Sequence, residues 1–395
     1  MAQPMPGDMP GKMIDAFDSI PEALFSHSGA MLATVIGTSG STPAPLLSRI
    51  LVGETGERLA GTIGGGRVES EVIGAARVLA PSGKSAVTTF TLDEDHPESG
   101  MFCGGTLDVF IEPVTRRDLG FFESLCERRD AGDDSIRGTL IGRDGVIIDR
   151  FLTPPGLASL HPPAPAAPLP GSGDRAEGPA GFFEWSLPGR EALMRAIDDA
   201  SRRGVAARIP VNEGQLIVEL VPGAPSLFLF GGGHVSSAVS KIAAMAGFRV
   251  TVIDDRPEFA NPVRFPEAAR TVAADFLDSF TRITIKPSSS IVIVTAAHRS
   301  DELVLGAAVT TPAGYIGMIG SRKKVAAVIG RLVARGVPGE TLRRVRTPIG
   351  VDIGAVTPGE IAVGIVAELI HARRSPLAPL GFKSDRTISK QETTP

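Results

Sequence analysis

The hydrophobic pattern divides the chain into two parts with different rhythms. Before about residue 222, a few amphipathic helices are mixed with several strands. From Ser226 onward, short apolar runs alternate with helical stretches of about ten to fifteen residues. This alternation requires crossover connections and predicts a parallel sheet. We therefore predict an α/β protein, with an α+β domain over residues 1–222, a Rossmann-type doubly wound domain over 223–380 and a flexible tail over 381–395.

The first part has its own local signals. Val68, Val72, Ala76 and Leu79 fall on one face of a helix that follows the stretch GTIGGGRVES. Another helix is expected over 13–26, and strands are expected over 30–37, 48–53, 85–92 and 106–114. The interval 153–180 is rich in Pro, and the eleven residues 161–171 contain five prolines, which helices and central strands do not tolerate. We interpret it as a flexible insertion.

Composition and charge narrow the class of function. The chain has 395 residues, a formal net charge of -4 and a pI near 5.9, so its charge gives no reason to expect nucleic acid or an anionic membrane as partner. No stretch approaches the roughly 20 apolar residues of a membrane span, and the N-terminus lacks the apolar core of a secretory signal. We expect a soluble, cytoplasmic protein.

The strongest motif begins where the first strand of the second part ends. Gly231 and Gly233 follow LFLF, a helix begins near His234, and Asp254 closes the next strand. In a Rossmann unit the glycines allow a tight turn and close approach to a diphosphate, and the acid binds a ribose hydroxyl. The third glycine of the motif is replaced by Ser236. The pattern predicts the fold, but whether a dinucleotide binds stays open because fold does not fix ligand.

A His and an Asp follow a later strand of the same part. His298 and Asp301 lie in TAAHRSDE, at the edge of the sheet where open α/β folds bind ligands. They can act as an acid/base or ligand pair. The alternative is that Asp301 only charges the first helical turn and His298 is solvated.

Two further helix starts follow strands. In YIGMIGSRKK, Ser321 is placed as a cap and Arg322 in the first turn, where a cation opposes the helix dipole; a bound phosphate explains this, and a basic surface turn is the alternative. Thr357 and Glu360 fit a capping box, so Glu360 is expected to be structural.

The first part contains a glycine loop and a thiol that could bind a ligand. Gly64, Gly65 and Gly66 precede a helix that begins near Arg67, so backbone N–H groups face a guest there, unless the loop is a glycine turn without ligand. Cys103 is followed by Gly104 and a strand, which leaves its sulfur accessible as a ligand or nucleophile. Cys126 lies four residues after Phe122 on an apolar helix face and is expected to be a core residue.

Taken together, these motifs resemble a known family. GTSGSTPAP, GTIGGGRVES and MFCGGTLDVFIEP, followed in order by LFLFGGGHV, TVIDDRPEF, TAAHRSDE, YIGMIGSRKK and TPIGVDIGAVTPGEIAVGIVAE, are similar to the xanthine dehydrogenase accessory factors, the XdhC/CoxI-like proteins. The resemblance covers both parts of the chain and fails only across the Pro-rich interval.

The resemblance implies a molybdenum cofactor chaperone rather than a free-standing enzyme. Such a protein binds the molybdopterin cofactor while a cysteine desulfurase supplies sulfur, and delivers it to a molybdenum hydroxylase client; a homodimer is expected. The glycine loop 64–66, Cys103 and Gly104 would belong to the cofactor site of the first domain. Gly231, Gly233 and Asp254 would form a nucleotide-like cradle in the second, with a nucleotide or NAD(P) as its candidate guest.

One departure from the family pattern concerns the thiols. Many relatives have Cys where this chain has Arg67, which cannot ligate molybdenum but can pair with the phosphate of the cofactor. Cys103 therefore remains the candidate metal ligand. The principal rival interpretation is an NAD(P)-dependent oxidoreductase in which His298 acts as acid and base, and a third is an interaction scaffold whose Rossmann half binds nothing.

Overall fold

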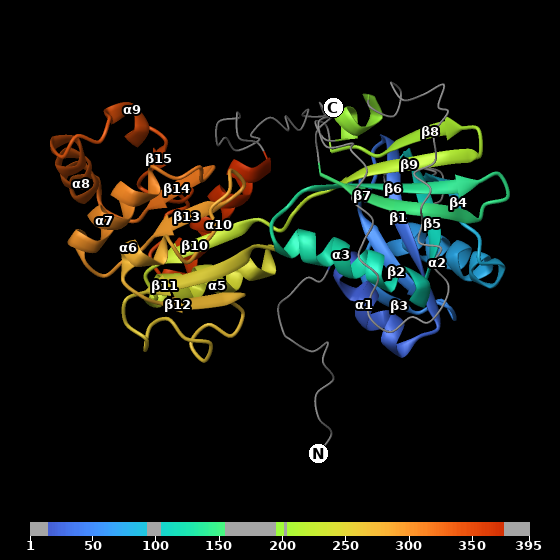
Figure 1. Cartoon of the computed structure of the whole chain (residues 1–395), viewed down its shortest axis with the longest axis horizontal. Helices are drawn as coiled ribbons and strands as arrows, with labels where there is room; N and C mark the ends of the chain where they lie inside the picture. Colours follow the sequence, from blue (N-terminus) through green and yellow to red (C-terminus); the bar gives the residue numbers. More distant parts are fainter. Residues whose placement is uncertain (1–14, 93–103, 155–194, 201–203, 375–395) are drawn as a thin grey trace, which may run out of the picture. The chain divides into compact units, whose positions relative to one another are not determined.

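The computed structural model describes residues 15–92, 104–154, 195–200 and 204–374. The chain divides into two compact units whose boundary lies between Gly223 and Ala224 (Figure 1). We call Ile14–Gly223 the N-terminal unit and the part from Ala224 the C-terminal unit. Both combine helices and sheets, and the predicted α/β class is confirmed.

The N-terminal unit is built on a five-stranded antiparallel sheet in the order β3-β2-β1-β5-β4. Side chains alternate along each strand, so apolar residues point to both faces of this sheet. Helices cover both faces. Val68, Val72 and Ala76 of one helix pack on one face, and Phe17 and Phe122 of two others belong to the cluster on the opposite face. The elements are α1 (Ala16–Ser26), β1 (Gly29–Gly40), β2 (Arg49–Gly53), β3 (Arg58–Thr62), α2 (Gly66–Leu79), η1 (Ala80–Ser82), β4 (Ala86–Leu92), β5 (Gly105–Thr115), η2 (Arg116–Asp118) and α3 (Leu119–Asp130).

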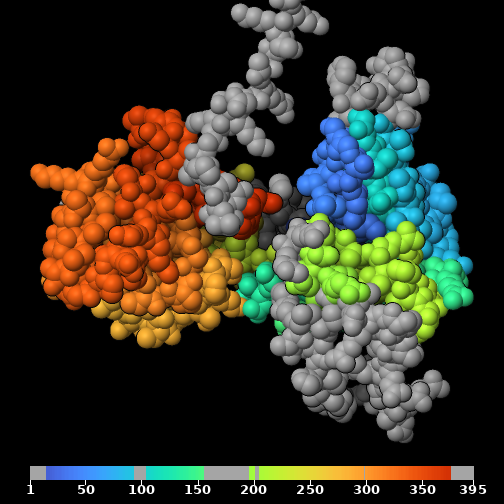
Figure 2. All heavy atoms as spheres, turned by 90° about the horizontal axis from the view of Figure 1, so that it is seen from above, coloured from blue at the N-terminus to red at the C-terminus, as the bar shows by residue number. Residues whose placement is uncertain are grey.

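A second antiparallel sheet completes this unit, in the order β7-β6-β9-β8. Its strands are β6 (Ser135–Gly142), β7 (Ile147–Thr153), β8 (Ala207–Val211) and β9 (Gly214–Val221). Strand β8 is an edge strand with Pro210 in it, and it belongs to the light green part of the chain that Figure 2 shows at the surface. Strands β6 and β7 were not predicted from the sequence. Most of the Pro-rich interval, from residue 155 onward, lies outside the described residues.

The C-terminal unit contains a six-stranded parallel sheet between two layers of helices (Figure 1). Its order, β12-β11-β10-β13-β14-β15, is the 3-2-1-4-5-6 order of a Rossmann fold, so the chain direction across the sheet reverses between β10 and β13. The elements are β10 (Ser226–Phe230), α5 (His234–Met245), β11 (Arg249–Asp254), β12 (Arg270–Ala273), α6 (Phe276–Ser279), β13 (Ser290–Ile293), α7 (His298–Ala308), β14 (Tyr315–Met318), α8 (Arg322–Ala334), α9 (Gly339–Leu342), β15 (Val345–Arg346) and α10 (Pro358–Arg374).

A chain of buried ion pairs joins the two sheets of the N-terminal unit. Arg137 of β6 is 1% exposed and pairs with Glu112 of β5 and, at 2.7 Å, with Glu219 of β9. Glu219 also pairs with Arg49 of β2. The two carboxylates outweigh the desolvation that burial imposes, so the pKa of the Arg137 guanidinium lies above its usual value and the side chain stays charged.

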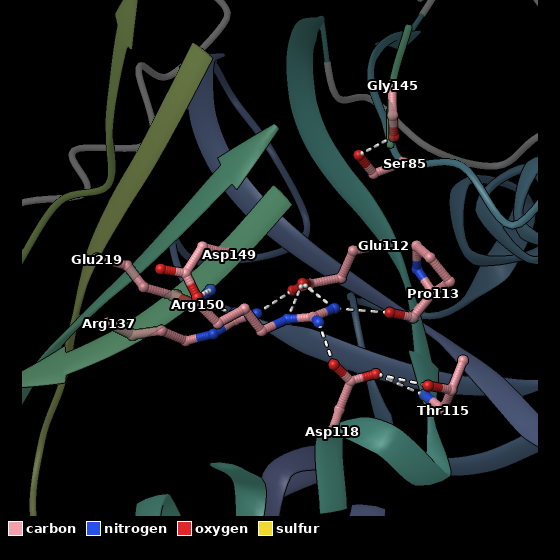
Figure 3. Close-up of polar contacts among 10 residues, drawn as sticks. All are labelled: Ser85, Glu112, Pro113, Thr115, Asp118, Arg137, Gly145, Asp149, Arg150 and Glu219. Atoms are coloured by element: carbon pink, nitrogen blue, oxygen red, sulfur yellow. Dashed lines mark hydrogen bonds and ion pairs between the residues drawn. The ribbon is translucent and has the colours of Figure 1, made fainter. Parts of the chain in front are cut away.

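The chain of charges ends on Arg150 of β7 (Figure 3). This guanidinium donates to Glu112 Oε2 at 3.1 Å, to the Pro113 carbonyl at 2.7 Å and to Asp118, whose other oxygen accepts the N–H and hydroxyl of Thr115 at 2.8 and 2.9 Å. Arg49, Arg137 and Arg150 thus face Glu112, Asp118 and Glu219, so the formal charges balance. The arrangement fixes the packing of the sheets and leaves no net charge for a ligand.

Candidate functional site

The glycine turn after β10 lies at the carboxyl edge of the parallel sheet. Gly231 has φ +108°, and a Cβ there would lie 2.4 Å from the Val294 carbonyl oxygen, next to the residues that follow β13. A Cβ on Gly232 would lie 2.0 Å from the Phe259 carbonyl oxygen, whereas one on Gly233 would meet no atom within 4 Å. Tight packing therefore falls on the first two glycines, and open space lies above the third.

Four helix starts in the structure differ in how their N–H groups are satisfied. Helices α2 and α5, which follow the two glycine loops, and α7, which begins at His298, have no side chain that caps them. Helix α8 is capped by Ser321, whose hydroxyl accepts from the N–H of Lys324 at 3.3 Å. Uncapped helix N-termini after glycine turns are a common setting for anions. Since β10 and β13 are neighbours, α5 and α7 both begin at the point where the sheet reverses.

Asp254, the last residue of β11, is 1% exposed and faces the glycine turn. Its carboxylate accepts the N–H of Gly232 at 2.7 Å and bonds the guanidinium of Arg256 at 2.8 and 3.1 Å. Burial raises the pKa of this carboxyl, but the bonds from Arg256 and Gly232 outweigh it and the pKa lies below its usual value. Asp254 is therefore a charged acceptor at neutral pH. Ser236, at the position of the third glycine, is buried and its hydroxyl donates to the Gly231 carbonyl.

Asp301 is fully buried beneath this edge, in the first turn of α7. One carboxylate oxygen accepts the hydroxyl of Thr295 at 2.7 Å and the other lies 2.5 Å from Lys324 Nζ. Asp301 is therefore shielded from direct contact with a ligand, and the side chain of its partner Lys324 is 19% exposed. The side chain of His298 lies outside the described part of the structure, and Arg322 is exposed at the start of α8.

A smaller prediction in this unit, the capping box at Thr357, is confirmed. Glu360 accepts the N–H of Thr357 at 2.9 Å and its own N–H donates to the Thr357 hydroxyl at 3.3 Å, which is the predicted capping box. Its role is structural, as expected.

In the N-terminal unit, the glycine loop 64–66 is held from inside by an acid. Glu69 is 9% exposed and its carboxylate accepts the Thr62 hydroxyl at 2.5 Å and the N–H groups of Ile63 and Gly65 at 3.1 and 3.2 Å. Those two N–H groups therefore face an acid of the protein. A Cβ on Gly65, which has φ +74°, would meet no atom within 4 Å, so the outer face of the loop is open.

Three of the sequence motifs meet at one end of the five-stranded sheet. Gly40 at the end of β1 pairs with Gly105 at the start of β5, and the N–H of Ser41 donates to the Gly104 carbonyl at 3.3 Å. A Cβ on Gly64 would lie 3.0 Å from the backbone of Pro43. The loops GTSGSTPAP and GTIGGGRVES and the start of β5 are thus adjacent.

The two remaining candidates in this unit differ in what can be described. Arg67 is 57% exposed and its Nε lies 2.6 Å from Glu71 on the same helix. Cys103 lies outside the described residues, directly before Gly104. Across the described part of the chain, no group of three or more His, Cys, Asp or Glu side chains is arranged to hold a metal ion.

Sequence reasoning missed four residues that shape these sites: Glu69, Arg256, Thr295 and Lys324. Each acts on a predicted residue from a neighbouring turn or helix. Glu69 and Lys324 had a signal, because each lies in the first turn of its helix.

Comparison with known families adds an independent observation. Residues 227–369 match the XdhC Rossmann domain, and residues 24–91 match the XdhC and CoxI family. These two matches span more than half of the chain and agree with the motifs quoted above. The chain belongs to the XdhC and CoxI family.

Relatives of this XdhC/CoxI chain include two bacterial proteins. A protein of Bacillus subtilis, described as a probable subunit of xanthine dehydrogenase, is 24% identical over 350 residues, covering 87% of this chain and 93% of the relative. The uncharacterized protein YqeB of Escherichia coli is 33% identical over 159 residues, which are 40% of this chain and 29% of that protein.

A crystal structure described as a xanthine dehydrogenase from Bacillus halodurans has the same fold. It superimposes with a TM-score of 0.69 at 22% identity and covers 93% of this chain and 98% of its own. Among the described helices, none has the length and apolar character that crossing a membrane requires.

Proposed function

We propose that this XdhC/CoxI chain is an accessory factor for a xanthine dehydrogenase-type molybdenum hydroxylase, and that it binds the molybdenum cofactor during sulfuration and insertion. Family membership and the name of the Bacillus subtilis relative support the link to xanthine dehydrogenase. The observation that carries the binding role is that both glycine loops lead into helices without a capping side chain, beneath open space at Gly65 and Gly233.

The residues present fit an anionic guest in the N-terminal unit. Above Gly65 the loop leaves room, Arg67 offers an exposed guanidinium for a phosphate, and Gly104, the residue after Cys103, is exposed. The thiol of Cys103 is the proposed metal ligand. The bound cofactor would supply the metal-centred chemistry, and this chain would orient it and hold its phosphate.

In the C-terminal unit, the same proposal places a nucleotide at the carboxyl edge of the parallel sheet, at the turns that follow the neighbouring strands β10 and β13. The N–H groups that begin α5 would face a diphosphate, and Asp254 would accept ribose hydroxyls. The nucleotide is part of the cofactor or a separate molecule such as NAD(P). In either case a cysteine desulfurase and the hydroxylase client are the expected partners.

The test compares the two cysteines of the chain. The Cys103→Ala variant is expressed in a host that produces the cofactor and is purified anaerobically. It is expected to retain less molybdenum and pterin than wild type and to activate the hydroxylase less. Cys126→Ala is the matched control, since burial raises the pKa of its thiol to about 12 and its sulfur contacts the Phe17 carbonyl at 3.4 Å. Equal retention by both variants would contradict the role of Cys103.

A second pair tests the phosphate contact. Arg67→Gln is expected to weaken cofactor retention, while Glu71→Gln, which removes the partner of Arg67, is expected to preserve it. Stoichiometric nicotinamide in place of pterin in the purified protein would favour the oxidoreductase alternative.

A further inference from the structure

Asp254, the proposed acceptor for ribose hydroxyls in the C-terminal unit, already accepts its full number of hydrogen bonds from the chain itself. Asp254 Oδ2 accepts from Gly232 N at 2.7 Å and from Arg256 Nη2 at 3.1 Å. Asp254 Oδ1 accepts from Arg256 Nε at 2.8 Å and from Arg256 N at 3.1 Å. A carboxylate has about four acceptor positions, so none is left for a ribose hydroxyl. A ribose reaches Asp254 only when the Arg256 side chain leaves.

Arg256 is placed so that it can leave. Its side chain is 40% exposed, and its guanidinium lies over the ring of Phe259 at 3.8 Å. A second acid, Asp255, lies 3.6 Å from Arg256 Nε and is 51% exposed. The guanidinium therefore has another partner within a short movement, while the backbone donors of Gly232 and Arg256 keep the Asp254 carboxylate in place.

A neighbouring arginine provides the contrast. Arg264 also lies over the Phe259 ring, at 4.9 Å, but its Nε donates to the Gly232 carbonyl at 2.9 Å. It occupies no acceptor of Asp254. The two arginines share an aromatic ring and the vicinity of the glycine turn, and differ in whether they block the acid.

We propose that Arg256 is a displaceable latch on the ribose site: it occupies Asp254 when no nucleotide is bound and passes to Asp255 when a ribonucleoside diphosphate enters. This inference rests on the part of the proposed function that gives the C-terminal unit a nucleotide. The ligand class is a nucleotide with free 2′ and 3′ hydroxyls, because Asp255 and the exposed Glu258 disfavour a phosphate on the ribose.

The direction in which one substitution changes the affinity for ADP tests the latch. ADP binding to the full chain is measured by calorimetry for wild type, Arg256→Met and the control Arg264→Met. Arg256→Met is expected to bind ADP about tenfold more tightly, the equivalent of one charged hydrogen bond that no longer has to be broken. If Arg256 instead bound the phosphates directly, Arg256→Met would bind ADP more weakly than wild type. Arg264→Met is expected to show no gain.

Ligand and partner variants sharpen the test. The gain from Arg256→Met should vanish with 2′,3′-dideoxy-ADP, which has no hydroxyl for Asp254. Asp255→Asn alone should bind ADP more weakly than wild type. Added to Arg256→Met, it should leave ADP binding unchanged. Unchanged or weaker ADP binding by Arg256→Met overturns the latch and leaves the nucleotide role standing. No ADP binding by any variant overturns both, while cofactor retention by the N-terminal unit is judged by its own copurification.

Discussion

Buried charges serve different purposes in the two units. In the described part of the N-terminal unit, three arginines and three acids form ion pairs with one another and with no other charged side chain, and Glu112 and Arg137 are no more than 1% exposed. In the C-terminal unit, the buried acids Asp254 and Asp301 each pair with a cation that is partly exposed. A charge network closed on itself stabilises packing. At Asp254 the partner Arg256 is partly exposed, which is what the proposed exchange with a ribose requires.

The largest effect is expected from breaking the closed network. Arg137→Met removes one ion-pair partner of Glu112 and leaves Glu219 with Arg49 as its partner. Both carboxylates are buried, so water cannot take the place of the lost guanidinium. Removing one partner of a buried ion pair costs about 3–5 kcal/mol. Calorimetric unfolding should show the transition of the N-terminal unit at lower temperature and that of the C-terminal unit unchanged.

The matched control is an exposed ion pair of the same unit. Arg67→Met removes the pair with Glu71, in which both side chains are more than one third exposed. Exposed pairs of this spacing contribute about 0.5 kcal/mol or less. If Arg137→Met and Arg67→Met shift the transition equally, the ion-pair chain is not what holds the sheets together.

A smaller loss is expected at the open edge of the C-terminal unit. Lys324→Met leaves the buried Asp301 with the Thr295 hydroxyl as its remaining side-chain partner. We expect a cost of about 2 kcal/mol in the unfolding of this unit, since an unsatisfied buried charged group costs more than a neutral one but water can enter along the vacated path. The exposed neighbour Lys323→Met is the control.

A double variant separates charge from packing at this edge. Asp301→Asn with Lys324→Met removes both charges, so stability should recover in part relative to Lys324→Met alone. A double variant that is less stable than the single one would show that Asp301 is held mainly by contacts other than its ion pair.

The same comparison explains which features could be predicted from the sequence. The apolar face of α2 and the capping box at Thr357 both depend on residues three or four positions apart, and both were predicted. The alternation of strands and helices also led to the parallel sheet. Strand β15 was missed because it has only two residues.

The charge networks could not be found in this way. Arg49 and Glu219 are 170 positions apart, and Arg137 meets Glu219 only because β6 and β9 pair in that register. Nothing in the sequence next to Arg49, Arg137 or Glu219 marks these side chains as buried. Asp254 was predicted from its place at the end of β11, but the guanidinium that covers it depends on the path of the following turn. Local patterns give elements, and long-range pairing decides which polar residues are buried.

The smallest effect concerns the acid that supports the glycine loop of the N-terminal unit. Burial raises the pKa of Glu69, but the bonds from Thr62, Ile63 and Gly65 outweigh it, and the pKa lies below the usual 4.5. A lowered pKa in the folded state stabilises the protein above pH 4.5, and this contribution is lost as the pH falls through the folded value. Glu69→Gln should cost about 1 kcal/mol at pH 7. It should also flatten the pH dependence of unfolding below pH 4.5. An identical slope for Glu69→Gln and wild type would mean that the loop is held by its own backbone rather than by the carboxylate.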